Sequence, residues 1–351
     1  MPAEQGRNGV STVLVTGGAG FIGSAVCRRL VAAGRGVVSV DALTYCGSEA
    51  ALESVAAAER FRSYRADIRD GADMLAIMRR ERIDSVMHLA AETHVDRSIA
   101  APELFVETNV LGTARLLDAA LRFRDELPQE LKGRFRFHHV STDEVFGDAG
   151  EDGASFSEAT PYSPSSPYAA SKAASDHLVR AWGRTYGLPF VVSNSTNTYG
   201  PFQYPDKLIP VMIANAIEGR PLPVYGDGRN VRDWLFVDDH ARALEKVMTS
   251  GATGESYVIA ARCERSNIEV VERICDLLDA RLPLADGGSR RELIAFVSDR
   301  PGHDRRYSAD PSKVERALGW RPEVDFEDGL ERTVDWYLRR EDWWRPLLHA
   351  G

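Results

Sequence analysis

The sequence has 351 residues, a net charge of −9, 44% hydrophobic residues and 27% charged residues, a composition typical of a globular chain with room for one large domain or two lobes. The acidic balance argues against a nucleic-acid-binding surface, and no apolar run approaches the roughly 20 residues of a membrane span. The four cysteines form no Cys-x-x-Cys pair, so we expect neither a zinc site nor a disulfide framework, and reduced thiols in a cytoplasmic protein are the default. Residues 1–11 are polar and contain no signal-peptide core, so we expect a loose tail there.

The first predicted elements are a strand, a glycine turn and a helix. Thr12–Thr16 has the apolar character of a buried strand, Gly17, Gly20 and Gly23 follow it, and a helical pattern covers 24–33. Glycines let the backbone approach a pyrophosphate closely, and the amino end of a helix supplies N–H groups and a positive dipole end. The arrangement predicts a dinucleotide-binding turn, with a purely structural glycine turn as the alternative.

The second predicted strand, at 36–40, indicates which dinucleotide binds. It ends at Asp41, near the spacing of about 20 residues expected after the glycine turn. A carboxylate at this point can accept both ribose hydroxyls and repels a 2′-phosphate, so we expect NAD rather than NADP. Arg35 is the one residue that favours NADP, because a nearby arginine can hold that phosphate.

Further strands are predicted at 61–66 and 85–89, and the amphipathic segment 102–123 is predicted to form one long helix. His88 lies inside an apolar strand, so we expect it to be packed rather than to bind a ligand. Alternating strands and helices of this kind predict an α/β fold with a doubly wound parallel sheet, the Rossmann arrangement.

A strand predicted at 135–140 leads into four oxygen-bearing side chains, Ser141, Thr142, Asp143 and Glu144. Two adjacent carboxyl groups at a strand end raise the pKa of one of them, so that one can act as an acid while its neighbour acts as a base. Solvated carboxylates in a loop are the alternative, and the residues downstream decide between the two interpretations.

The next functional segment is a helix with a tyrosine and a lysine on one face. Ser166 is the predicted N-cap, Pro167 the first helical residue, and Tyr168 and Lys172 lie four residues apart. A lysine ammonium beside a phenol stabilises the phenolate, so we expect the pKa of Tyr168 below its usual value of about 10. Such a phenolate can take a proton from a sugar hydroxyl while hydride leaves for NAD. A solvated helix face is the alternative.

Together these motifs resemble the extended short-chain dehydrogenase/reductase family, and within it the dTDP-glucose 4,6-dehydratase branch, through nearly the whole chain. The run Thr142-Asp143-Glu144 is the feature that resembles the dehydratase branch, because epimerases and decarboxylases of the superfamily share the cofactor motifs and the Tyr-x-x-x-Lys helix. The segments that carry the resemblance are 16–23, 41–45, 67–68, 88–98, 141–147 and 168–172.

The resemblance implies a role for each residue of the presumptive catalytic set. Tyr168, supported by Lys172, would deprotonate the 4-hydroxyl as NAD accepts hydride from carbon 4, and Thr142 would hydrogen-bond the 4-oxygen. Glu144 would then remove the proton on carbon 5, and Asp143 would protonate the departing 6-hydroxyl. The same hydride would return to carbon 6 and leave a 4-keto-6-deoxy sugar.

The resemblance also implies binding residues for NAD and for a nucleotide-diphospho-sugar, with dTDP-glucose as the first candidate. The expected cofactor contacts are Gly17, Gly20, Phe21, Ile22, Gly23, Asp41, Ala42, Leu43, Thr44, Asp67, Ile68, Leu89, Ala90, Ala91, Thr93, Thr108, Tyr168, Lys172 and Thr198. The expected substrate contacts are Thr93, Thr142, Asn197, Lys207, Leu208, Pro223, Tyr225, Arg232, Asn267, Arg300, His303 and Tyr307. No metal ligand is expected.

Two positions depart from the pattern of the family. Asn194 stands where the family commonly has arginine, and Thr198 follows Asn197 where the family usually has a second asparagine. Both departures fall beside the expected active site, so they bear on the sugar and on the cofactor contact.

The expected organisation is an NAD-binding Rossmann domain at 12–200, with interleaved later segments near 229–260, and a smaller α/β nucleotide-sugar-binding lobe mainly at 201–351. The helices at 102–123 and 167–186 resemble the dimer seam of the family, so we expect a homodimer, with neither nucleic acid nor membrane as a partner. The leading hypothesis is a nucleotide-sugar 4,6-dehydratase, a lyase. The alternatives are an epimerase or decarboxylase of the same superfamily and, more remotely, a non-catalytic NAD-sensing regulator.

Overall fold

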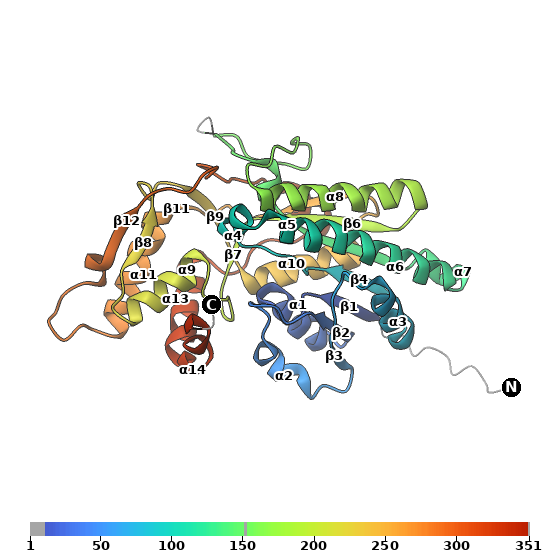
Figure 1. Cartoon of the computed structure of the whole chain (residues 1–351), viewed down its shortest axis with the longest axis horizontal. Helices are drawn as coiled ribbons and strands as arrows, with labels where there is room; N and C mark the ends of the chain where they lie inside the picture. Colours follow the sequence, from blue (N-terminus) through green and yellow to red (C-terminus); the bar gives the residue numbers. More distant parts are fainter. Residues whose placement is uncertain (1–10, 151–152, 350–351) are drawn as a thin grey trace.

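A seven-stranded parallel sheet forms the centre of the computed structural model, which describes residues 11–150 and 153–349 (Figure 1). The predicted tail at 1–11 lies outside the described residues except for Ser11. The strand order is β10-β6-β5-β4-β1-β2-β3, and every neighbouring pair is parallel. The strands are β1 (Thr12–Thr16), β2 (Gly36–Asp41), β3 (Phe61–Arg65), β4 (Ser85–His88), β5 (Arg136–Thr142), β6 (Phe190–Ser195) and β10 (Ser256–Ile259).

Helices cover both faces of this sheet, because its strands carry apolar side chains on both sides. Val13 and Val15 of β1 enter one core and Leu14 enters the other, as the two-residue repeat of a strand requires. The first core receives α1 (Phe21–Ala32), α2 (Glu53–Ala56), α10 (Val237–Ser250) and α12 (Ser312–Leu318), and the second receives α3 (Gly71–Glu81), α6 (Thr113–Glu126) and α8 (Pro167–Tyr186). The predicted doubly wound α/β fold is confirmed.

A smaller lobe with its own core lies at the left of Figure 1. Its sheets are small: β11-β9-β7 in one and β12-β8 in the other. The chain leaves this lobe for α10 and β10 of the large sheet and then returns to it. Its elements are β7 (Asn197–Tyr199), α9 (Leu208–Ile217), β8 (Leu222–Tyr225), β9 (Val231–Phe236), β11 (Glu264–Ser266), α11 (Asn267–Arg281), β12 (Ile294–Val297), α13 (Phe326–Arg339) and α14 (Glu341–Trp344).

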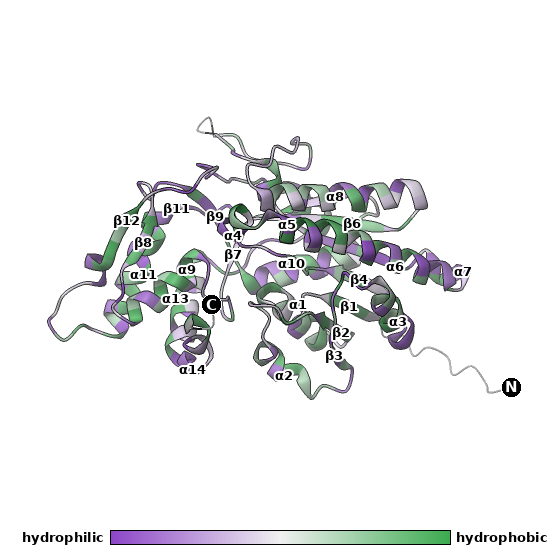
Figure 2. Cartoon of the chain, in the orientation of Figure 1, coloured by the Kyte–Doolittle hydropathy of each residue, from purple (hydrophilic) through white to green (hydrophobic). Residues whose placement is uncertain are grey.

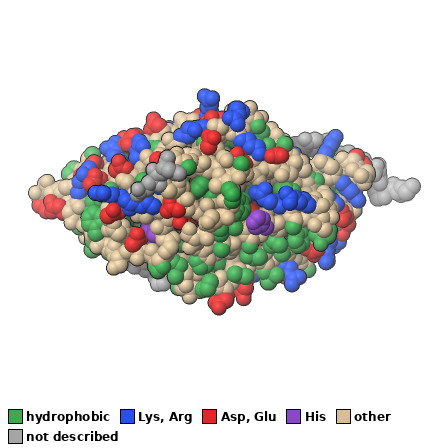
Figure 3. Space-filling view, turned by 90° about the horizontal axis from the view of Figure 1, so that it is seen from above, with side chains coloured by type: hydrophobic (Ala, Val, Ile, Leu, Met, Phe, Trp, Pro, Cys, Tyr) green, Lys and Arg blue, Asp and Glu red, His purple; other side chains and the backbone are tan. Residues whose placement is uncertain are grey.

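Hydrophobic residues concentrate on the inner sides of the helices and in the strands of both lobes (Figure 2). Trp343 and Trp344, near the carboxyl end of the chain, are buried in the core of the smaller lobe. Seen from above, hydrophobic side chains also reach the surface near the middle of the face that carries α8 (Figure 3). Within the two described ranges, no helix is both long and apolar enough to cross a membrane.

The expectation of one regular helix at 102–123 is wrong in its middle. The segment consists of α5 (Pro102–Phe105), a π-helical stretch η2 (Val106–Gly112) and α6. In this π-helical stretch the carbonyl of Asn109 accepts hydrogen bonds from Ser175 Oγ at 2.6 Å and Thr113 Oγ1 at 2.5 Å. Asn109 Nδ2 also donates to Ser171 Oγ at 2.8 Å, so the irregular turn ties η2 to α8.

Candidate active site

A cavity of about 610 Å³ lies at the carboxyl ends of the parallel strands, where α/β sheets bind their ligands. Residues from β1 to β6 line one side, and residues from α9 and β8 of the smaller lobe line the other. Every residue predicted to bind the cofactor, to bind the substrate or to act in catalysis lines this cavity, with one exception. Leu43 is absent from the lining, and it contributes only its backbone N–H, which donates to Asp41 Oδ1 at 2.8 Å.

The glycine turn has the shape that a dinucleotide pyrophosphate requires. Gly17 has a φ of +68°, and a Cβ there would lie 2.8 Å from the backbone nitrogen of Ala90. A Cβ on Gly23 would lie 1.9 Å from the carbonyl oxygen of Gly17, so neither position has room for a side chain. No side chain caps α1, whose first turn borders the cavity at Phe21 and Gly23, so its N–H groups remain for an anionic ligand.

Asp41 is the last residue of β2, lines the cavity and is held by backbone N–H groups. Its Oδ2 accepts from the N–H of Ala19 at 3.0 Å, and its Oδ1 accepts from the N–H of Leu43. Burial raises the pKa of Asp41, although these backbone hydrogen bonds oppose the rise. A fixed carboxylate in this place suits the ribose of NAD.

The four polar residues predicted at the end of β5, Ser141 to Glu144, all line the cavity. Thr142 is both the last residue of β5 and the N-cap of a 3-10 turn, η3 (Asp143–Phe146), and its Oγ1 accepts from the N–H of Glu144 at 3.2 Å. Because the chain turns at this point, Thr142, Asp143 and Glu144 all reach the cavity instead of alternating between the faces of the sheet. Asp143 is 1% exposed, so a solvated loop is excluded as its environment.

The two adjacent carboxyl groups differ in their surroundings. Burial, together with the charges of Glu144 and Asp233, raises the pKa of Asp143 well above its usual value. Burial also raises the pKa of Glu144, but Arg300, Arg232 and Lys207 oppose that rise. The surroundings of the two carboxyl groups therefore differ in the direction that the predicted acid and base require.

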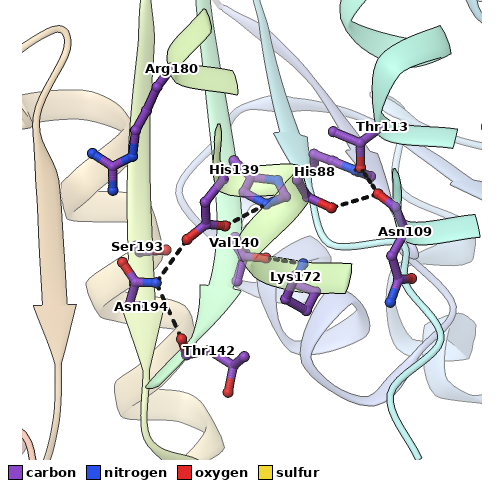
Figure 4. A network of polar contacts seen from close by, with 12 residues as sticks. His88, Asn109, Thr113, His139, Val140, Thr142, Lys172, Arg180, Ser193 and Asn194 are labelled. Carbon is purple, nitrogen blue, oxygen red and sulfur yellow. Dashed lines mark hydrogen bonds and ion pairs between the residues drawn. The ribbon is translucent and has the colours of Figure 1, made fainter. Parts of the chain in front are cut away.

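Tyr168 and Lys172 occupy one face of α8 beside the end of β5. The predicted N-cap is confirmed, because Ser166 Oγ accepts from the N–H of Ala169 at 3.1 Å. Lys172 Nζ donates to the carbonyl of Val140 at 2.9 Å (Figure 4), and burial lowers the pKa of Lys172 to about 8. The ammonium of Lys172 is thus held against β5, the strand that Asp143 and Glu144 follow.

The expectation of a lowered pKa for Tyr168 is wrong for the protein alone. Burial and the negative charge of Glu144 raise it above the usual value, and a hydrogen bond with the side chain of Thr142 opposes the rise. Burial dominates because Tyr168 is 7% exposed, and the ammonium of Lys172 is engaged by a backbone carbonyl. The positive charge of an oxidised nicotinamide is the kind of neighbour that favours the phenolate.

The smaller lobe supplies the cationic wall of the cavity. The guanidinium carbon of Arg232 lies 4.2 Å from the centre of the Tyr307 ring, and its nitrogens donate to the carbonyls of Val231 at 2.7 Å and Asp304 at 3.0 Å. Lys207 Nζ donates to the carbonyl of Thr93 at 2.8 Å, which links the lobe to the large sheet. These cations, together with Arg300, suit a diphosphate.

Several further residues line the cavity that the motifs did not indicate as binding residues, among them Tyr45 and Asp206. The hydroxyl of Tyr45 donates to Asp206 Oδ2 at 3.1 Å, and the guanidinium carbon of Arg97 lies 3.9 Å from the Tyr45 ring centre. Tyr45 belongs to a segment that carries the family resemblance, which was the available signal. Nothing local in the sequence pairs it with Asp206, which lies 161 residues away.

The departure at Thr198 has a visible consequence. Thr198 Oγ1 lies 2.9 Å from Nδ1 of His240, and Nε2 of the same ring lies 2.6 Å from Ser195 Oγ. Burial lowers the pKa of His240 to about 3, so the ring is neutral and serves as a hydrogen-bonded spacer. Thr198 remains in the cavity lining, but its hydroxyl is engaged by this histidine.

The parallel sheet, the glycine turn and the buried Tyr-x-x-x-Lys helix define an enzyme of the extended short-chain dehydrogenase/reductase class. The family model described as GDP-mannose 4,6 dehydratase matches residues 14–333. The chain is 54% identical over 342 residues to the dTDP-glucose 4,6-dehydratase of Neisseria meningitidis serogroup B. The alignment covers 97% of this chain and 96% of that protein. It is 53% identical to dTDP-glucose 4,6-dehydratase 1 of Escherichia coli, with 94% of each chain covered.

Solved structures agree with these relatives. DesIV, the dTDP-glucose 4,6-dehydratase of Streptomyces venezuelae, was crystallised with NAD bound; it is 45% identical, with a TM-score of 0.87, and the match covers 96% of this chain and 99% of that one. The Bacillus anthracis enzyme in complex with NAD is 38% identical, with a TM-score of 0.84, over 96% of this chain and 100% of that one. The chain belongs to the family of nucleotide-sugar 4,6-dehydratases, which are lyases, and the resemblance found in the sequence is confirmed.

The pKa of Glu144 is expected to depend on the cations of the smaller lobe. We expect Arg300→Met to raise the pKa of Glu144, because removing a nearby positive charge disfavours the carboxylate. NMR titration of ¹³C-labelled glutamate side chains measures this pKa. Arg229→Met is the matched control, since Arg229 is an exposed turn residue near Asp227 and should leave Glu144 unchanged. An unchanged pKa of Glu144 in Arg300→Met would contradict the electrostatic role of this wall.

Proposed function

We propose that the chain is an NAD-dependent dTDP-glucose 4,6-dehydratase that forms dTDP-4-keto-6-deoxyglucose. The observation that carries the proposal is that Thr142, Asp143, Glu144 and Tyr168 line one buried cavity with the glycine turn. Oxidation at carbon 4 needs a base and a dinucleotide, whereas loss of water across carbons 5 and 6 needs an acid and a second base. The cavity holds a candidate for each of these requirements.

The proposed roles follow the protonation states. Tyr168 takes the proton of the 4-hydroxyl, Thr142 hydrogen-bonds the 4-oxygen, and Lys172 supports the charge on the phenolate. Glu144 removes the proton that the 4-ketone has made acidic on carbon 5, and Asp143 gives its proton to the departing 6-hydroxyl. The raised pKa of Asp143 supports its role as the acid, because it favours the protonated form of the carboxyl, which has a proton to give.

NAD is the proposed cofactor, and it supplies the hydride acceptor at carbon 4 and the donor at carbon 6. The absence of room for side chains at Gly17 and Gly23 supports the pyrophosphate position. Asp41 supports the ribose position, and NAD is bound in the solved relatives. The remaining predicted binding residues, except Leu43, are proposed contacts of NAD or of the nucleotide sugar because they line the same cavity.

An epimerase of the same class is the competing function. The UDP-glucose 4-epimerase of Thermus thermophilus is 31% identical, with a TM-score of 0.81, so the fold alone does not separate the two activities. Epimerisation through a 4-ketone has no use for a protonated Asp143 beside Glu144. The buried acid pair therefore favours the dehydratase.

We expect incubation with dTDP-glucose to give a 4-keto product, detected by its absorbance in base, with no net accumulation of NADH. The reason is that the hydride taken from carbon 4 returns to carbon 6. Other nucleotide sugars assayed in parallel test the nucleobase and the hexose. Stoichiometric build-up of NADH, or an epimer without loss of water, would overturn the assignment.

Asp143→Asn and Glu144→Gln are expected to reduce kcat by roughly 10²-fold or more, because each removes one of the two groups that eliminate water. Both substitutions preserve side-chain size, so the affinities for NAD and dTDP-glucose should change little. Steady-state kinetics and calorimetric titration measure the two effects. Full activity in either variant would remove that residue from the mechanism.

We further propose a homodimer built on α8 and on the segment 102–123, which α5, η2 and the first part of α6 form. Val106 and Leu111 of η2 are 55% and 46% exposed, and Tyr186 at the end of α8 is 51% exposed, so both elements carry apolar side chains that no other part of the described chain covers. The proposed lobes remain 12–200, with segments near 229–260, and 201–351. A cytoplasmic location is supported by the unpaired state of Cys27 and Cys275, both of which are buried.

The double substitution Val106→Glu with Leu111→Glu should convert the dimer into a monomer, because it places charges in an apolar seam. Size-exclusion chromatography with light scattering measures the mass. Phe296→Glu is the control, since Phe296 is 60% exposed on β12 of the smaller lobe, far from the proposed seam. A monomeric wild-type protein would overturn the proposal.

A further inference from the structure

Asp176 is a fully buried carboxylate that none of the roles above uses. It lies on α8, four residues after Lys172 and eight after Tyr168, so the three side chains fall along one face of the helix. Asp176 does not line the cavity, which means that it touches neither cofactor nor substrate. A buried charge is costly, and its presence beside the catalytic residues needs a physical reason.

The hydrogen-bonding partners of Asp176 are neutral. Its Oδ2 accepts from the hydroxyl of Tyr162 at 2.6 Å and from Asn194 Nδ2 at 3.1 Å, and its Oδ1 lies 3.1 Å from His139 Nε2. Burial and the charge of Lys172 lower the pKa of His139 to about 4, so its imidazole is neutral near pH 7. These groups orient the carboxylate without cancelling its charge.

Two cations face this carboxylate, both from α8. Arg180 donates to the hydroxyl of Tyr162 at 3.0 Å, so it acts on Asp176 through that phenol. Lys172 is the other: it lies one helical turn before Asp176 on the same buried face of α8, and the negative charge of Asp176 opposes the effect of burial on its ammonium. The other titratable groups beside Lys172 are Tyr168 on α8 and His139 and His88 on the neighbouring strands. The pKa of each histidine is lowered by burial and by Lys172 itself.

Asn194 connects this charge to the active site. Its Nδ2 donates to Asp176 and also to the carbonyl of Thr142 at 3.2 Å, so one amide holds the carboxylate and the backbone of β5 together (Figure 4). An arginine at position 194 would bring a full charge to Asp176. The neutral asparagine leaves the carboxylate available to Lys172.

We propose that Asp176 is a positioning residue that keeps the ammonium of Lys172 charged inside the protein, and that Asn194 couples this carboxylate to Thr142. The catalytic consequence rests on the proposed function, because only a charged Lys172 supports the phenolate of Tyr168. Asp176 itself exchanges no proton with the substrate.

The test measures the charge of Lys172 directly, without reference to activity. The NAD-loaded protein is labelled with ¹³Cε-lysine and titrated by NMR, and Lys172→Arg identifies the resonance among those of Lys132, Lys207, Lys246 and Lys313. We expect Asp176→Asn to lower the pKa of Lys172 by about one unit or more, because a negative neighbour that favours the ammonium is lost. Tyr162→Phe is the matched control, since it removes a hydrogen bond to Asp176 and retains the charge.

Asn194→Arg provides a second route should Asp176→Asn fold poorly, because the added guanidinium pairs with Asp176 and repels Lys172. It should lower the pKa of Lys172 in the same direction. In active enzyme, the alkaline limb of the kcat profile should move to lower pH in both variants, with unchanged affinity for dTDP. An unchanged pKa of Lys172 in every folded variant, or an equal shift in Tyr162→Phe, would overturn the inference. An inactive wild-type protein would instead overturn the proposed function.

Discussion

The cost of burying charge governs the region where β5 meets α8. Asp143, Lys172 and Asp176 are almost entirely excluded from solvent, and each is tolerable only because of its neighbours. The carbonyl of Val140 binds the ammonium of Lys172, and neutral donors hold the carboxylate of Asp176. The catalytic groups are therefore parts of one electrostatic unit whose protonation states are set together.

The parallel sheet makes this unit possible. β5 and β6 run side by side, with Thr142 opposite Ser195 and Ser141 opposite Asn194, so the polar ends of both strands meet at one edge. α8 crosses the same edge and places its polar face over it. The π-helical turn at Asn109 adds a second support, because the hydroxyls of Ser171 and Ser175 on α8 bond to its amide and carbonyl. The catalytic helix is thus held from two sides.

The smaller lobe contributes the positive charges that act on Glu144. Glu144 faces Arg232, Arg300 and Lys207, all of which come from the second half of the chain. The same cations suit a diphosphate, so the groups proposed to bind the nucleotide sugar also favour the ionised form of Glu144. This sharing explains why the site lies between two lobes: neither lobe alone holds both the acid pair and the cations that make its members unequal.

The local motifs could be predicted from the sequence, because the geometry of each is set within a few residues. The turn from Gly17 to Gly23, the carboxylate of Asp41 and the Tyr168–Lys172 spacing each depend on a short stretch of backbone, and each side chain lies where the motif predicts. The family resemblance extended that reading to Arg300 and Tyr307, far along the chain. Leu43 is the predicted binding residue that does not line the cavity, because adjacency to a binding residue does not decide which way a side chain points.

Charge states and irregular turns depended on contacts between distant segments. The direction of the Tyr168 pKa follows from burial and from Glu144, and spacing within one helix cannot report either. The pairing of Thr198 with His240, the π turn at Asn109 and the isolation of Asp176 likewise arise only when strands and helices pack. The amino-acid sequence alone thus established the fold, the family and the identity of the chemical groups, since these depend on local pattern. Packing alone decided which of those groups carry a proton, because an ionisation equilibrium responds to everything that surrounds the group.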